Sequence, residues 1–283
     1  MRRTKRGGWP YSQPPNVPFT LNKDSPQAKG LVAWWPTLAS RGANILRDLS
    51  GYGHDGTLEN GTAWELLPVL GQALLFAGDD DYIAVGTPPA LNNLAQGAFS
   101  AAFWHRYILN DAALRRIWFK RSPGNGWSIY LSRSTTQRLW VAVEGAVADG
   151  ISETVSGEIP QNELYHVVVT YDDNGDRLSR IYINGYEVSA YQTQTATNGV
   201  VGDDSGVNLN IGGRVGNEPL ERNLVDCRIY NCVLTDAEAY TLYARGTRWE
   251  LYKPLVPWIL ALSPITVRIP RYGFTNFQVP GIV

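Results

Sequence analysis

The chain has 283 residues, is 44% hydrophobic and 18% charged, and carries a formal net charge of −1. This length and apolar fraction suit a single large globular domain, and the many Trp, Tyr and Gly residues (10, 15 and 28) beside a single Met favour β-structure. Apolar runs stay short of the ~18 residues of a membrane span, and no apolar signal core follows the basic first residues, so we expect neither a membrane span nor a signal peptide.

The N-terminal segment, residues 1–29, is predicted to be an extended basic arm. It holds six Lys or Arg against one Asp, and eleven of the 17 prolines fall in residues 1–36 and 254–283. Proline removes a backbone donor and restricts the residue before it, so such segments stay extended. The alternative is a solvated terminus without a partner. The arm residues expected to contact an acidic partner are Arg2, Arg3, Lys5, Arg6 and Trp9.

The body of the chain, residues 30–246, is predicted to be built of strands. Aromatic and β-branched residues alternate with polar ones in a series of short segments. Turn residues separate them, most clearly at 123–126, 172–176 and 184–185. The net charge is +5 over residues 1–29 and +2 over residues 254–283, so residues 30–253 carry −8 of the total of −1. An acidic body argues against nucleic acid as a partner. The expected strands include 99–107, 116–120, 127–131, 138–144, 164–171, 180–183, 207–213 and 224–230.

One helix is predicted, over residues 235–245. Thr235 and Glu238 have the spacing of a capping box, and Gly246 supplies the stop. Many strands with a single short helix indicate an all-β fold, a two-sheet antiparallel jelly-roll sandwich with one short C-terminal helix and extended N- and C-terminal arms.

The C-terminal segment, residues 247–283, is predicted to be a second extended arm, rich in proline and apolar residues. Residues 255–262 and 265–274 are too apolar for a free solvated tail, and exposed apolar stretches usually mark partner surfaces. The expected contact residues are Trp249, Trp258, Arg268, Arg271 and Phe274.

Several stretches in the body together resemble the laminin-G-like, concanavalin-A-like jelly-roll family. Residues 30–36 resemble its opening strand, 48–58 its D-x-S-G-x-G-x-x-G-T-L turn and 71–83 its G-x-A-L-x-F stretch. The strands at 165–171, 181–185, 209–213 and 225–238 follow in the family's order. Tyr165 stands where the family usually has tryptophan, and Cys227 replaces the second acid of its D-D pair.

Residues 247–254 resemble an element that follows such domains in tailed-phage and prophage proteins. This resemblance implies a bacteriophage virion protein, a capsid decoration or tail-associated protein made in the host cytoplasm. Its expected partners are capsid or tail proteins, with the chain forming a homo-oligomer.

The nearest enzymes with this fold are glycoside hydrolases, which need two carboxylates facing each other across the scissile bond. No E-x-D-x-E or E-x-D-x-x-E string occurs, and Glu153 and Glu158, five residues apart, would lie on opposite faces of an extended strand. The three histidines His54, His105 and His166 form no metal-binding pair. We therefore expect a protein without catalytic residues.

The sequence also contains residues that suit two kinds of binding site. The family resemblance implies one cofactor, a structural calcium ion bound by Asp48 and Asp226. The alternatives are that Asp48 caps a turn and that Asp226 is a surface acid. Trp64, Trp118, Trp127 and Trp140 could form a platform for sugar rings, against the alternative of core packing.

Three functions remain from the sequence. The first is a structural assembly protein of a virion, anchored by its arms. The second is a carbohydrate-binding module for cell-surface glycans, which is compatible with the first. The third is a glycoside hydrolase or lyase, which the missing carboxylate pair disfavours.

Overall fold

The computed structural model describes residues 17–40, 43–78, 80–106, 114–132, 137–160, 163–214, 218 and 220–255. Nine of the predicted arm residues lie outside these ranges, so their contacts stay predictions. They are Arg2, Arg3, Lys5, Arg6, Trp9, Trp258, Arg268, Arg271 and Phe274.

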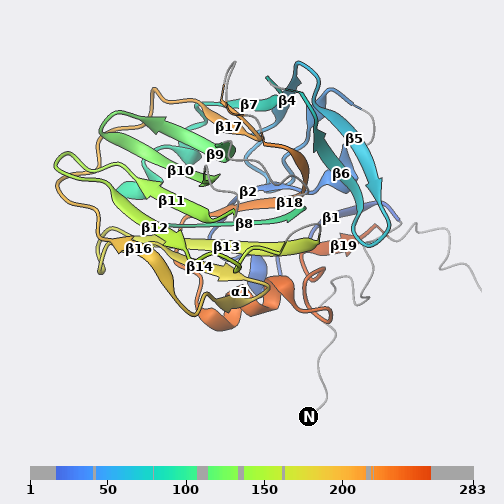
Figure 1. Cartoon of the computed structure of the whole chain (residues 1–283). Coiled ribbons are helices and arrows are strands. Elements are labelled where there is room, and N and C mark those ends of the chain that lie inside the picture. The colour runs from blue at the N-terminus through green and yellow to red at the C-terminus, as the bar shows by residue number, and fades with distance from the viewer. Residues whose placement is uncertain are drawn as a thin grey trace, which may run out of the picture.

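The described chain folds into two large antiparallel sheets that face each other (Figure 1). The first has the order β16 (Tyr191–Thr195), β12 (Gly150–Thr154), β11 (Leu139–Val143), β10 (Asn125–Leu131), β9 (Arg115–Ser122), β17 (Leu209–Ile211), β7 (Tyr82–Gly86), β4 (Gly56–Glu59) and β3 (Ile45–Leu46). The second has the order β15 (Tyr186–Glu187), β14 (Arg180–Ile183), β13 (Leu164–Asp172), β8 (Ala98–Arg106), β18 (Arg222–Tyr230), β6 (Gly71–Phe76) and β5 (Ala63–Leu67), and β2 (Leu31–Trp35) also pairs with β18. We call them the nine-stranded and the eight-stranded sheet.

Shorter elements complete the described part. β1 (Phe19–Leu21) pairs with β19 (Tyr252–Pro254), and α1 (Asp236–Tyr243) lies over the eight-stranded sheet. Single 3-10 turns occur at Pro26–Ala28, Thr37–Ala39, Pro89–Leu91 and Leu94–Gln96. No helix in the described ranges combines the length and the apolar character needed to span a bilayer.

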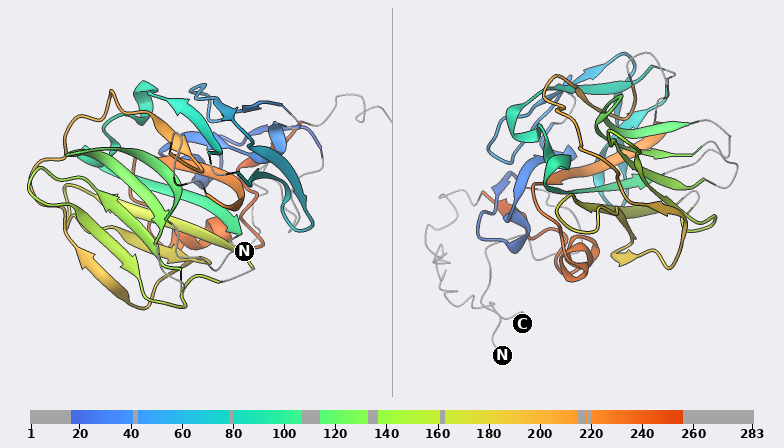
Figure 2. Two further views of the ribbon diagram at one scale, coloured as in Figure 1. Left: turned by 45° about the horizontal axis from the view of Figure 1, so that its top comes forward. Right: turned by 90° about the vertical axis from the view of Figure 1, so that its left-hand side faces the viewer.

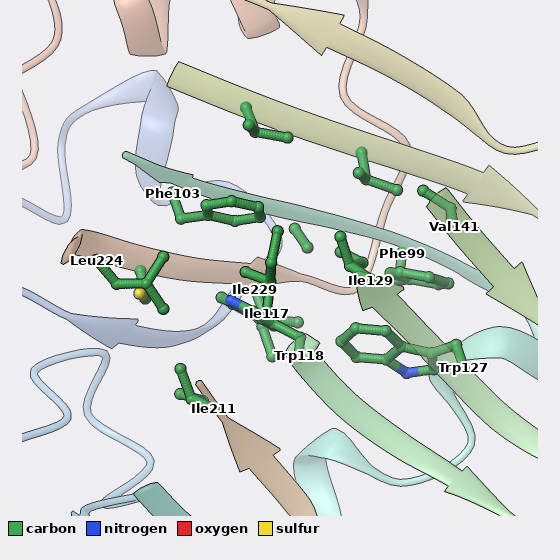
Figure 3. Close-up of a cluster of buried hydrophobic side chains, with 14 of the residues drawn as sticks. Phe99, Phe103, Ile117, Trp118, Trp127, Ile129, Val141, Ile211, Leu224 and Ile229 are labelled. Atoms are coloured by element: carbon green, nitrogen blue, oxygen red, sulfur yellow. The ribbon is translucent and has the colours of Figure 1, made fainter. Parts of the chain in front are cut away.

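The main core lies between the two large sheets (Figure 3). Because strand side chains alternate, β8 sends Phe99 and Phe103 into this core and Trp104 to the other side. Phe99 stacks on Trp127 at 4.8 Å between ring centroids, and Phe103 on Trp118 at 5.9 Å. The aromatic residues that favoured β-structure in the sequence therefore build the space between the sheets.

A second core covers the outer side of the eight-stranded sheet. Trp34, Trp104 and Tyr252 belong to it, together with Trp249, which is only 1% exposed. The packed domain therefore runs through β1 at one end and β19 at the other, beyond the expected boundaries at residues 29 and 247. Trp249 is a core residue in this structure and not the arm contact that the sequence suggested.

The predicted fold class is confirmed. The sheets are antiparallel and one α-helix is present among the described residues. Thr235 and Glu238 form both hydrogen bonds of the capping box, and α1 begins at the residue after Thr235. The segment 172–176 is the predicted turn, between β13 and β14.

Candidate functional site

The outer side of the nine-stranded sheet carries the most distinctive group of side chains outside the cores. On β10, Trp127, Ile129 and Leu131 point into the main core, so Ser128 and Tyr130 point away from it. On β11, Val141 and Val143 point inward, so Trp140 points outward beside Tyr130, its partner across the strand pair.

A β-bulge extends this surface onto β9. The pairing between β9 and β10 shifts between Ile129 and Tyr130, which face Trp118 and Arg116, and Ile117 has no partner in this register. Ile117 and Trp118 are both in the main core although they are neighbours. The extra residue reverses the alternation and aims Arg116 outward, onto Tyr130.

Three aromatic rings and one guanidinium form a continuous group here, which we call the outer aromatic face: Arg116, Phe119, Tyr130 and Trp140. The Tyr130 and Trp140 rings lie 5.5 Å apart with 31° between their planes. The Arg116 guanidinium lies 4.6 Å from the centroid of Tyr130 and 5.2 Å from that of Phe119. Such cation–π contacts contribute about 0.5–2 kcal/mol each and hold the rings in place.

The rings differ in exposure. Phe119 and Trp140 are half-buried, and Tyr130 is 8% exposed beneath Arg116. Burial raises the pKa of Tyr130 above its ordinary value, although the nearby Arg116 and Arg121 lower it. Tyr130 is therefore a neutral phenol at physiological pH, as a tyrosine with the ordinary pKa of 10.0 already is.

Ion pairs surround the aromatic rings. Arg138 pairs with Glu153 at 2.6 Å, and Arg116 pairs with Glu218 at 2.8 Å. Arg121 pairs with Asp149 at 2.8 Å and also with Glu144. These carboxylates are therefore engaged with arginines and not turned toward one another.

Glu153 and Glu158 do not form a facing pair of carboxylates. Glu153 lies on the outer side of β12 opposite Trp140, where it also accepts a hydrogen bond from Thr193. Glu158 lies beyond the end of β12 and accepts a hydrogen bond from Ser189.

Four buried polar atoms of this region have no hydrogen-bond partner among the described residues. They are Arg116 Nη1, Ser128 Oγ, Arg138 Nε and Trp140 Nε1. Buried polar groups are normally satisfied, so each of these has unused capacity for a water molecule or a ligand atom. Trp118 and Trp127 also have unpaired indole nitrogens, but in the core. On the outer side, by contrast, the four unpaired polar atoms lie on or next to the neighbouring strands β9, β10 and β11.

The structure separates the four candidate tryptophans. Trp118 and Trp127 are fully buried in the main core, and Trp64 packs against that core from β5. Only Trp140 of the four lies on the outer aromatic face. The sequence did not single out Arg116, Phe119 or Tyr130.

Asp48 does not present free oxygens to a metal ion. It accepts hydrogen bonds from the backbone N–H groups of Trp34, Ser50 and His54 at 2.8–2.9 Å. The Ser50 hydroxyl donates to it as well, at 2.7 Å. The alternative interpretation of Asp48 as a turn cap fits these contacts.

Asp226 is likewise engaged. It accepts hydrogen bonds from Trp34 Nε1 at 2.8 Å and from the Tyr252 hydroxyl at 2.9 Å, and pairs with Arg228 at 2.5 Å. It is buried, so it is not the surface acid of the alternative interpretation. Within the described ranges no three His, Cys, Asp or Glu side chains gather as metal ligands would. These contacts do not fit a calcium ion held by Asp48 and Asp226.

Two facing antiparallel sheets with this strand order define the class of protein: a concanavalin-like jelly-roll sandwich. Residues 77–239 match a family described as the concanavalin A-like lectin/glucanases superfamily, and the chain belongs to this family. No curated protein matches the chain.

Solved structures show the same fold at low sequence identity. The binding domain of botulinum neurotoxin serotype D is 16% identical with a TM-score of 0.57, and that of Paraclostridial Mosquitocidal Protein 1 is 18% identical with a TM-score of 0.60. Each match covers 77% of this chain and 52% of the other. Trypanosoma rangeli sialidase in complex with sialic acid is 16% identical with a TM-score of 0.55, over 76% of this chain and 32% of that one. The chain thus spans about half the length of the toxin domains and about a third of the sialidase.

Proposed function

We propose that this protein is a non-catalytic carbohydrate-binding domain that holds a glycan on the outer aromatic face. The observation that carries the proposal is the row of Phe119, Tyr130 and Trp140 on the solvent side of a sheet, fixed by Arg116. Aromatic rings offer apolar surface to the C–H faces of sugars, and a few convergent polar groups fix the orientation of a ligand.

Two further observations support glycan binding over catalysis. Glu153, the carboxylate opposite Trp140, is bound to Arg138, and Glu144, past the far end of β11, is bound to Arg121. A hydrolase instead needs one carboxyl group as an acid and another as a nucleophile or base. Among the solved structures with this fold, one is the binding domain of botulinum neurotoxin DC in complex with SialylT. At 16% identity that likeness concerns the fold.

A glycan array tests the proposal. The wild-type chain is expected to bind at least one class of glycan, and Trp140→Ala to lower the affinity about 10- to 100-fold, because stacked aromatic residues dominate such contacts. Trp64→Ala is the matched control, since Trp64 is also a half-buried tryptophan but lies on β5 of the other sheet. Binding that survives Trp140→Ala unchanged would exclude the outer aromatic face as the site.

A second function, display on a virion, is favoured by where the chain leaves the domain. Leu255 N–H donates to Pro18 O at 2.8 Å, beyond the β1–β19 pair, so both described ends lie together. This pair packs on the outer side of the eight-stranded sheet, whereas the strands that carry the outer aromatic face, β9, β10 and β11, belong to the opposite sheet of the sandwich (Figure 2). We propose that arms leaving there anchor a homo-oligomer to a capsid or tail while the aromatic face points away.

Truncation separates this second function from the first. Removing residues 1–16 and 256–283 keeps all the described strands and both cores and is expected to abolish association with the particle. Glycan binding is expected to persist in the same variant. Normal assembly without either segment would exclude the anchoring role.

A further inference from the structure

One arginine beside the outer aromatic face differs from its neighbours. Arg214 follows β17 and is exposed, and its guanidinium lies 5.5 Å from the centroid of the Phe119 ring. Arg116 approaches the same ring at 5.2 Å. Phe119 therefore carries two guanidinium groups, one half-buried and one open to solvent.

The neighbouring arginines are neutralised, and Arg214 is not. Arg116 pairs with Glu218, Arg138 pairs with Glu153, and Arg121 has two carboxylates. In the part of the chain that the structure describes, Arg214 has no carboxylate within ion-pair distance. Stacking on Phe119 holds its guanidinium in position without using its donors.

The charges are also separated along the face. Gly212 N–H donates to Ile117 O at 2.8 Å, which brings the residues after β17 to the end of the face where Arg116 lies. At that end Arg116 is paired with Glu218 and the neighbouring Arg115 with Glu221, so Arg214 adds a positive charge that no carboxylate in the described ranges neutralises. Arg121 lies toward the opposite end of β9 with two carboxylates. An anionic ligand is therefore attracted to the Arg214 end and repelled from the Arg121 end.

We infer that the glycan bound here contains an acidic sugar, and that its carboxylate binds Arg214. This inference rests on the proposed glycan-binding function and names the class of ligand. The planar guanidinium offers two parallel N–H donors to a carboxylate, a geometry that a neutral hydroxyl does not complete. The rest of the glycan then extends across Phe119 toward Trp140.

The test is a glycan array in which each carboxylate-bearing glycan is printed beside its neutral counterpart, desialylated or carboxyl-reduced, and beside a sulfated one. The wild-type chain is expected to bind the carboxylate-bearing member about tenfold more tightly at low salt, with the preference decreasing as salt screens the charge. In Arg214→Gln, the affinities for the carboxylate-bearing glycan and its neutral counterpart are expected to differ by no more than about twofold. The matched control is Arg245→Gln, since Arg245 is also exposed but follows α1.

The outcomes distinguish this inference from the function on which it rests. Equal binding of carboxylated and neutral glycans would overturn the acidic-sugar inference and leave the glycan-binding function standing. A preference for the sulfated member, or a carboxylate preference that Arg214→Gln leaves unchanged, would also overturn the inference. Binding to no glycan would overturn both.

Discussion

The Arg116 guanidinium lies 4.6 Å from the centre of the Tyr130 ring because one extra residue, Ile117, interrupts the pairing of β9 with β10. Without that bulge, alternation would place Arg116 on the same side as Trp118, in the core. The bulge thus produces two features at once: a tight pair of apolar residues inside and a stacked cation outside.

Replacement by alanine is expected to lower mainly the stability at Trp118 and mainly the glycan affinity at Trp140. Trp118 is fully buried, so Trp118→Ala should cost about 3–5 kcal/mol of unfolding free energy and lower the Tm by roughly 6–20 °C. Trp140 lies outside the core, so Trp140→Ala should cost about 1 kcal/mol or less of unfolding free energy while lowering the affinity for the glycan about 10- to 100-fold. Thermal unfolding of both variants measures this, and a larger Tm loss for Trp140→Ala would contradict the assignment of inner and outer sides.

The buried pair of Asp226 and Arg228 is expected to hold the second core together. Arg228 also donates to Gln27 Oε1 at 2.8 Å and to the carbonyl of Arg248 at 3.1 Å. Arg228→Met leaves the Asp226 charge buried and uncompensated, at a cost of about 3–5 kcal/mol. Adding Asp226→Asn should recover part of this loss, since asparagine tolerates the positive φ of 53° at that position. Urea unfolding of the single and double variants measures the recovery, and no recovery would contradict an uncompensated charge as the cause.

Lys120 is expected to be a structural cation. Its ammonium group is fully buried and contacts Asn92 Oδ1, the carbonyls of Asp204 and Val207, and Asp204 Oδ1, at 2.7–3.2 Å. Burial lowers its pKa, while Asp204 raises it. Lys120→Met removes the charge, leaves the buried Asp204 carboxylate uncompensated and takes the ammonium donor from Asn92 Oδ1 and the Val207 carbonyl, which should cost about 3–5 kcal/mol. Calorimetry that found an unchanged Tm would show that the oxygens find other donors.

Acid is expected to destabilise the domain through His105 and His166. The pKa of each is lowered to about 3, by burial in both cases and, for His166, also by the charges of Arg228 and Arg248. Between the ordinary value of 6.5 and about 3, the unfolded chain binds protons that the folded chain does not. Stability is therefore complete above pH 6.5 and falls as the pH decreases, by about 1.4 kcal/mol per unit for each histidine.

The variant His166→Gln isolates one of these contributions. Urea unfolding at pH 7, 6, 5 and 4 should give a shallower fall in unfolding free energy than in the wild type. An equal slope in both proteins would mean that the pKa of His166 is not lowered by folding.

Much of the fold followed from local patterns in the sequence. Thr235 and Glu238 predicted the start of α1 because a capping box depends on residues three apart. The turn at 172–176 and the alternating strands on either side were predicted for the same reason, since turn chemistry and alternation are local.

The outer aromatic face could not be predicted in the same way. Ile117, Trp118 and Phe119 are three adjacent apolar residues, so the sequence shows no alternation there from which the core-facing side of β9 or the place of a bulge could be predicted. Which residue of β9 is the extra one in the bulge depends on the register of β9 with β10. The burial of Trp249 also depended on distant partners, because the β1–β19 pair joins residues more than 200 positions apart.

The most direct test of glycan binding at the outer aromatic face is an NMR titration that follows the ten tryptophan indole N–H signals, with the Trp140 signal assigned from Trp140→Phe. Adding the tightest-binding glycan from the array should shift the Trp140 signal and leave those of Trp118 and Trp127 in place. A bound glycan that leaves the Trp140 signal unmoved would contradict the account.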